Sequence, residues 1–118
     1  MKFSFDNNFP IYLQIEKVLK TQIVNGMIKP NEKIPSVRAL ALEYNVNPNT
    51  IVKTLAILET EGFIYTDSTN GKYVVDNKEF LQTAKDKLLN EMIDTFLNEM
   101  SSLGYDKTDI IKIIEKRG

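Results

Sequence analysis

The chain has 118 residues, 42% hydrophobic and 26% charged, which suffices for one ordinary domain or a small domain with an appendage. It contains no cysteine and no histidine, which excludes a disulfide framework, a thiolate metal site and the commonest general base. No apolar run approaches the roughly 20 residues of a membrane span, and residues 1–10 lack the apolar centre of a secretory signal. We therefore expect a cytoplasmic protein that needs no cofactor and no membrane.

The first predicted helix begins at Pro10 and runs to about Asn25. Apolar side chains such as Ile15 and Leu19 lie on one of its faces, with the spacing of an amphipathic helix. Gly26 follows, and glycine readily adopts the left-handed conformation that often terminates a helix. The pattern therefore predicts one amphipathic helix ahead of the central part of the chain.

Residues 34–62 predict two further helices joined by a tight turn. Ser36 can cap the first of them, because its hydroxyl can accept a hydrogen bond from an unpaired backbone N–H. Asn45 tolerates the left-handed conformation that would end this helix. Asn47 can cap the second helix, and Pro48 suits its first position, where a missing N–H costs nothing.

The second of these helices has a buried stripe and a polar side. The stripe consists of apolar residues at i, i+4 and i+7, namely Ile51, Leu55 and Leu58. On the other side, close to the start of the helix, lie three polar residues, Asn49, Thr50 and Lys53. A short helix, a turn and a longer helix with polar donors at its start is the arrangement of a DNA-reading helix-turn-helix.

A β-hairpin is predicted after the helix-turn-helix. Residues 63–66 and 72–75 are rich in β-branched and aromatic side chains, and they flank an Asn-Gly turn. Asn70, Gly71 and Lys72 would lie at or near its tip. Three helices followed by a hairpin predict a winged helix, and residues 33–34 could add a very short strand.

The character of the chain changes at Asp76. We predict a long helix that is capped by Asp76 or Asn77 and stops at Gly104, then a last helix capped by Thr108. The apolar stripe of these helices is wider than they can cover themselves, and apolar surface left in water is costly. A two-fold interface with a second copy would cover it economically. The predicted contact residues are Leu88, Met92, Phe96, Met100, Ile110 and Ile114.

The sequence thus predicts a mainly α fold with a small β-hairpin in two domains. Residues 1–75 would form a winged helix-turn-helix domain with a net charge of +1, and residues 76–118 a helical dimerisation domain with −2. This charge is low for DNA binding, because phosphate contacts supply much of the affinity. One face would still be positive if it gathered the basic residues Lys33, Arg38, Lys53 and Lys72.

Two short motifs in the central part are specific enough to indicate a family. These are IPSVR at residues 34–38 and NPNTI at residues 47–51, with Gly62 following. With them, residues 9–75 resemble the N-terminal winged-helix domain of the GntR family of bacterial transcription regulators. The short two-helix tail resembles the YtrA-type subfamily, in which the tail dimerises the protein.

The resemblance implies roles for individual residues. Ser36 and Arg38 would contact DNA, with Arg38 reaching the major groove or its phosphates. Gly71 and Lys72 would belong to the wing that approaches the minor groove. Both basic residues have an alternative role without DNA. Arg38 could form an ion pair with a neighbouring glutamate, Glu32 or Glu43, and Lys72 could simply be solvated.

The start of the recognition helix would carry base readout. Asn49, Thr50 and Lys53 occupy it, and asparagine suits adenine while lysine suits guanine. Many family members have arginine where Asn49 or Lys53 stands, so the resemblance does not set the base preference. The bland alternative for Thr50 is a hydroxyl that bonds its own backbone.

We therefore expect a dimeric, sequence-specific, DNA-binding transcription regulator, a repressor on a two-fold symmetric double-stranded operator. The alternative is a winged helix that serves as a protein-interaction module without DNA. No nucleophile–base pair or phosphate loop indicates an enzyme. The short tail leaves little room for a pocket, so an unidentified small-molecule effector would bind at the dimer interface or between tail and winged helix.

Overall fold

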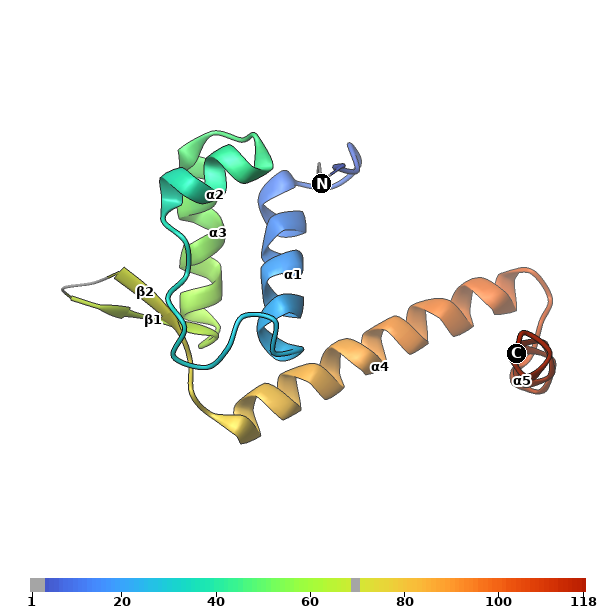
Figure 1. The fold of residues 1–118 in the computed structure, drawn as a ribbon. Helices are drawn as coiled ribbons and strands as arrows, with labels where there is room; N and C mark the ends of the chain where they lie inside the picture. Colours follow the sequence, from blue (N-terminus) through green and yellow to red (C-terminus); the bar gives the residue numbers. More distant parts are fainter. Residues whose placement is uncertain (1–3, 69–70) are drawn as a thin grey trace. The chain divides into compact units, whose positions relative to one another are not determined.

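The computed structural model describes residues 4–68 and 71–118. The chain divides into two compact units, Met1–Gln82 and Thr83–Gly118, called here the winged-helix unit and the tail unit (Figure 1). The change of character that the sequence shows at Asp76 comes earlier than this division, because the first turn of a long helix packs with the winged-helix unit.

The winged-helix unit contains three helices, α1 (Ile11–Val24), α2 (Val37–Tyr44) and α3 (Pro48–Thr60). α3 is central, since it packs against α1, α2 and the first strand of the hairpin (Figure 1). The core consists of the apolar stripes that the sequence predicted together with hairpin residues. Its most deeply buried side chains are Ile15, Ile23, Leu40, Ile51, Thr54, Leu58 and Val74.

The helix ends confirm the predicted caps. The Ser36 hydroxyl accepts a hydrogen bond from the backbone N–H of Ala39 at 3.1 Å, and the Asn47 side chain accepts one from Asn49 at 2.8 Å. Asn45 ends α2 in the left-handed region with φ of 54°. The turn between α2 and α3 is therefore set by local hydrogen bonds and by one residue that tolerates a positive φ.

The hairpin consists of β1 (Ile64–Asp67) and β2 (Gly71–Val74), which pair antiparallel with Asp67 opposite Gly71. The predicted hairpin is thus confirmed, although Asn70 lies outside the described residues. The very short strand predicted at residues 33–34 is a single bridge between Lys33 and Tyr73. This bridge joins the segment before α2 to the outer edge of β2.

The long helix α4 (Lys78–Ser102) begins in the winged-helix unit. Asn77 caps it by accepting a hydrogen bond from the backbone N–H of Phe80 at 3.0 Å. The Phe80 ring meets the Phe63 ring edge to face, with centroids 5.1 Å apart. This aromatic contact holds the first turn of α4 against the winged-helix unit.

The last helix, α5 (Lys107–Glu115), begins two residues earlier than a cap at Thr108 would place it. Asp106, not Thr108, caps it, and Thr108 lies inside its first turn. The Asp106 carboxylate accepts from the Asp109 N–H at 2.9 Å, and the Asp109 carboxylate accepts from the Asp106 N–H at 3.1 Å. This reciprocal capping box satisfies two backbone donors, which a threonine at position 108 cannot do.

Across residues 4–68 and 71–118, no helix combines the length and the apolar character that crossing a membrane would require.

Candidate nucleic-acid interface

The first two turns of α3 present polar side chains to solvent. Asn49 and Lys53 are exposed and Thr50 is half-buried. Neither the Asn49 amide nor the Thr50 hydroxyl has a hydrogen-bond partner among the residues that the structure describes. In the structure, the Thr50 hydroxyl therefore does not bond its own backbone, which was the alternative role for it. Both groups can donate to and accept from a base edge or a phosphate.

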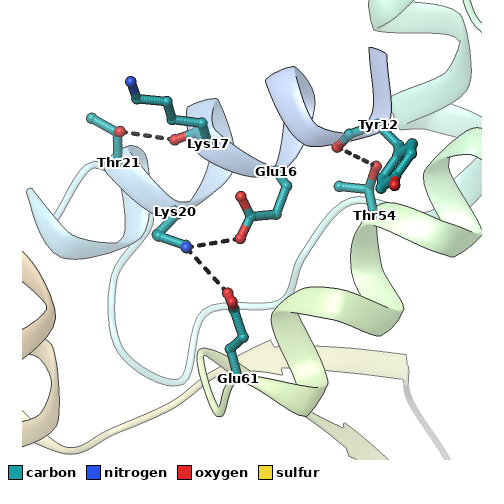
Figure 2. A network of polar contacts seen from close by, with 7 residues as sticks. All are labelled: Tyr12, Glu16, Lys17, Lys20, Thr21, Thr54 and Glu61. Atoms are coloured by element: carbon teal, nitrogen blue, oxygen red, sulfur yellow. Dashed lines mark hydrogen bonds and ion pairs between the residues drawn. The ribbon is translucent and has the colours of Figure 1, made fainter. Parts of the chain in front are cut away.

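Lys53 lies at the side of α3 that faces α1. Its ammonium is 3.9 Å from the centroid of the Tyr12 ring, a cation–π contact between the two helices. Figure 2 shows Tyr12 beside Thr54, whose hydroxyl donates to the Tyr12 carbonyl at 3.1 Å. In the unbound protein the Lys53 ammonium contacts Tyr12 of α1. Its predicted contact with the DNA major groove therefore stays a prediction.

A cleft of about 360 Å³ lies between the start of α2 and the hairpin, and it brings together three of the predicted site residues. Ser36, Gly71 and Lys72 line it, and Lys33 lines it with them. The Ser36 oxygen is engaged as a helix cap, which leaves its O–H as a donor for a phosphate oxygen. Backbone N–H groups at the start of a helix favour the same ligand.

Gly71 is favoured by its backbone conformation. Its φ is +103°, a conformation that side chains rarely adopt. A Cβ there would lie 3.3 Å from the Cε atom of Lys33. The Lys33 side chain thus lies close to the hairpin and lines the cleft together with Lys72.

Lys72 does not extend into solvent. Its ammonium is 2.9 Å from the Glu59 carboxylate and 2.8 Å from the Thr66 hydroxyl, which itself donates to Glu59. Hydrogen bonds from Thr66 and Lys72 lower the pKa of Glu59. The three side chains attach the hairpin to α3, so in the unbound protein Lys72 braces the wing. Its predicted DNA contact stays a prediction.

Arg38 is exposed on the first turn of α2. The alternative roles considered for it were ion pairs with Glu32 or Glu43. Its guanidinium forms no ion pair with any residue in the described part of the chain, and the Glu32 carboxylate accepts the Lys29 backbone N–H at 3.0 Å instead. Arg38 therefore has its donors available for a phosphate or a guanine edge.

Two residues of this region were not selected as site residues by the sequence analysis. Lys33 appeared there only as one of four basic residues, and its contact with the hairpin depends on chain packing. Val52 was not considered, although it follows Asn49 by three positions and therefore lies on the same helix face. It is 52% exposed.

A charged cluster fixes α1 to the C-terminal end of α3 and so holds the interface elements in place (Figure 2). Lys20 lies 2.8 Å from Glu16 and 3.1 Å from Glu61. Burial raises the pKa of Glu16, and the hydrogen bond from Lys20 opposes that rise. Burial alone would lower the pKa of Lys20, but the two carboxylates outweigh it and the pKa is raised. The ammonium therefore stays charged.

No group of acidic, histidine or cysteine side chains within residues 4–68 and 71–118 could hold a metal ion. The predicted site residues are hydrogen-bond donors and cations, with the Glu59 carboxylate beside Lys72.

Comparison with known proteins places the chain in a family. Residues 11–74 match the sequence model described as "Bacterial regulatory proteins, gntR family". The chain is 34% identical to the "Uncharacterized HTH-type transcriptional regulator YhcF" of Bacillus subtilis (strain 168), over 98% of this chain and 95% of that protein. It is 36% identical to the "HTH-type transcriptional repressor YtrA" of the same organism, over 82% and 75% of the two chains.

Solved structures agree with the sequence relatives. A "GntR family transcriptional regulator from Listeria monocytogenes" superposes with a TM-score of 0.87 at 38% identity, covering 95% of this chain and 98% of that one. The structure titled "Crystal Structure of AraR(DBD) in complex with operator ORE1" superposes with a TM-score of 0.55 at 27% identity, over 64% and 94% of the chains. The chain therefore belongs to the GntR family, whose members are DNA-binding transcription regulators and not enzymes.

Proposed function

We propose that this GntR-family regulator is a homodimeric repressor that binds a two-fold symmetric DNA operator. Each winged-helix unit would place the start of α3 in the major groove of one half-site. Helix-turn-helix dimers bind half-sites about one helical turn apart, and the operator symmetry mirrors that of the protein.

The main support for DNA contact is a cleft that is lined by three elements of the winged-helix unit. The start of α2, the hairpin and α3 contribute Ser36, Gly71 and Leu55 to its lining, and Lys33 and Lys72 supply positive charge. Arg38 and Asn49 lie on the first turns of the two helices, exposed to solvent. Cations and donors supplied by a helix-turn-helix and its wing fit a duplex, in which phosphates flank the base edges.

The dimer is supported by the apolar surface of the tail unit. Met92 is 62% exposed, Phe96 42% and Ile114 55%, while Leu88 and Met100 are half-buried. Large apolar side chains that are exposed in this number indicate a contact surface, because leaving them in water is unfavourable. Ile110 differs from the other predicted contact residues, since it is only 4% exposed and is thus already covered within one chain.

Repression is supported by the name of one relative. The Bacillus subtilis protein that is 36% identical over 82% of this chain is called a transcriptional repressor. A dimer on a symmetric operator represses by occupying a promoter. Control by a small molecule is compatible with this proposal and stays a prediction without an assigned site.

The test begins with the duplexes that the purified full chain selects from a random pool. We expect the enriched sequences to be inverted repeats with about one turn between half-site centres. Enrichment of a single, unrepeated motif would contradict the symmetric operator. Failure to enrich any duplex would contradict the DNA contact and favour a winged helix that binds protein.

Arg38→Ala is the matching variant. We expect it to weaken binding to a selected duplex roughly 10-fold or more, because each half-site loses a charge-assisted contact of about 1–3 kcal/mol. Lys17→Ala is the control, because Lys17 is exposed on α1 and loses the same charge. Affinities would be measured by fluorescence anisotropy, with circular dichroism to verify folding. An Arg38→Ala protein that binds as tightly as wild type would remove Arg38 from the interface.

A further inference from the structure

The exposed face of α3 contains apolar side chains among its polar ones. Asn49, Val52, Lys53 and Ala56 recur at i, i+3, i+4 and i+7 and are all exposed. Val52 is 52% exposed, whereas its neighbour Ile51 is fully buried. A β-branched residue lowers helix propensity slightly, so neither packing nor the helix explains a valine here.

The charged side chains on both sides of this face already have partners within the protein. Lys53 is directed to the Tyr12 ring, with its ammonium 3.9 Å from the ring centroid. Glu59, further along α3 on the side of the hairpin, is paired with Lys72 at 2.9 Å. Between these two engaged charges, the uncharged side chains near the start of the helix are Asn49, Val52 and Ala56.

This combination matches one kind of base pair. In the major groove adenine offers an acceptor and a donor that suit an asparagine amide, and thymine offers a C5-methyl group that suits an apolar side chain. Asn49 and Val52 are separated by three residues, or about 4.5 Å along the helix axis. Successive base pairs are separated by about 3.4 Å, so the two side chains can reach neighbouring base pairs.

We infer that Val52 is a specificity-determining residue that contacts the C5-methyl group of a thymine in each half-site, next to an adenine contacted by Asn49. The inference rests on the proposed DNA binding and makes it more specific, because it names A·T pairs as the base pairs that the start of α3 contacts. The isopropyl group covers the methyl group and removes both from water.

The test uses a duplex selected by the full-length wild-type chain, in which thymines are replaced one at a time by uracil. This replacement deletes the C5-methyl group and leaves the hydrogen-bonding edges unchanged. In each half-site we expect one position at which uracil weakens wild-type binding by about fourfold. This is the loss expected when one buried methyl group is deleted. Val52→Ala removes this contact from both half-sites of the proposed dimer, so it should bind the thymine duplex about 16-fold more weakly than wild type and show no further loss with uracil.

Leu42→Ala is the matched control. Leu42 is an apolar residue of α2 that is 76% exposed, and it lies outside the face defined above. This variant should keep the wild-type response to uracil. Circular dichroism would verify that Val52→Ala folds, which we expect because the side chain is exposed and alanine favours helix.

The outcomes separate this inference from the proposed function. If no duplex is enriched, the DNA-binding proposal itself fails. If duplexes are enriched but no uracil weakens wild-type binding, or the enriched half-sites lack thymine, Val52 does not contact a methyl group. If uracil weakens the Val52→Ala protein as much as wild type, another side chain makes that contact. Each of the last two results overturns the inference and leaves DNA binding intact.

Discussion

Glu16 is the most informative single residue of the winged-helix unit, because it is a carboxylate that is only 7% exposed. The single Lys20 ammonium forms ion pairs with both Glu16 and Glu61, and it also lies 5.2 Å from the centroid of the Phe63 ring. One ammonium thus links α1 to the end of α3 and to the residue that receives Phe80. Its loss would leave two carboxylates facing each other in a partly buried position.

We predict that Lys20→Met destabilises the chain by about 2 kcal/mol near neutral pH, below the 3–5 kcal/mol typical of fully buried pairs because Glu61 keeps contact with water. The pKa of Glu16 is raised by burial, so its proton is held more tightly in the folded state than in the unfolded chain. Its protonated form therefore favours folding below the unfolded pKa, and that contribution is lost as pH rises through the folded pKa.

The defect of Lys20→Met should therefore shrink on acidification, since a protonated Glu16 no longer needs the ammonium. Urea unfolding followed by circular dichroism at about pH 7 and about pH 5 would measure this difference. Lys17→Met, which removes an exposed lysine of the same helix, should change stability little at either pH. A Lys20→Met defect that is equal at both values of pH would contradict the assigned role of Glu16.

At the scale of the elements, Lys72 attaches the hairpin to α3, although the sequence predicted a DNA contact for it. Lys72 contacts Glu59 and Thr66, and the Tyr65 and Tyr73 rings stack with centroids 5.8 Å apart on the same hairpin. The wing is therefore supported by both a polar and an aromatic contact. Whether Lys72 also contacts a phosphate depends on how strongly Glu59 holds it.

Glu59→Gln would release that cation. We predict tighter binding to a selected duplex and a steeper salt dependence, by up to about 0.9 in the slope of log affinity against log salt for each Lys72 that reaches a phosphate. Glu43→Gln, which removes an exposed acid of α2, is the control for net charge. Titration by fluorescence anisotropy at several salt concentrations would show the effect, and equal slopes for the two variants would exclude the release of Lys72.

The same carboxylate has the opposite pH dependence to Glu16. The pKa of Glu59 is lowered by Thr66 and Lys72, so its contribution to stability is present above the unfolded pKa and is lost as pH falls through the folded pKa. Because the carboxylate is largely in contact with solvent, this contribution is small.

The start of α5 provides a prediction that distinguishes two neighbouring residues. Asp106→Ala should destabilise the tail unit by about 1 kcal/mol, because it removes the acceptor of the capping box. Thr108→Ala should be neutral or slightly stabilising, because Thr108 lies inside the helix, where alanine is favoured. Thermal unfolding at one protein concentration would compare the two, and a larger loss for Thr108→Ala would contradict the capping box.

At the scale of the whole molecule, the proposed function requires two copies of the chain. α4 has no buried residue, and several of its large apolar side chains are more than two-fifths exposed, among them Leu89, Met92, Ile93 and Phe96. In the proposed dimer these side chains would be covered by the second copy, and two winged-helix units would share one operator.

Phe96→Lys should therefore give a species of 13.5 kDa at micromolar concentration and weaken operator binding, with the winged-helix unit still folded. A buried lysine in a two-fold interface places two like charges close together, which is strongly unfavourable. Asn98→Lys is the control, because position 98 lies on the opposite side of the helix. Sedimentation would measure the mass, and a wild-type chain that is itself a 13.5 kDa species would contradict the dimer.

The sequence by itself determined the elements and the family. Caps at Ser36, Asn45 and Asn47 depend on atoms within a few residues of each other, so they can be inferred from the local sequence. The apolar period of each helix likewise follows from spacing alone. The one wrong cap, Thr108, lies two residues after a second candidate, Asp106, and the reciprocal hydrogen bond with Asp109 decides in favour of Asp106.

Only the tertiary structure decided which charges are engaged. The contacts of Lys53 with Tyr12, of Lys72 with Glu59 and of Lys20 with Glu61 each join two different elements of the fold. Long flexible side chains reach several neighbours, and packing determines which of them is within a few ångströms. For the same reason the exposure of Val52 and the burial of Ile110 followed from the fold and not from their residue types.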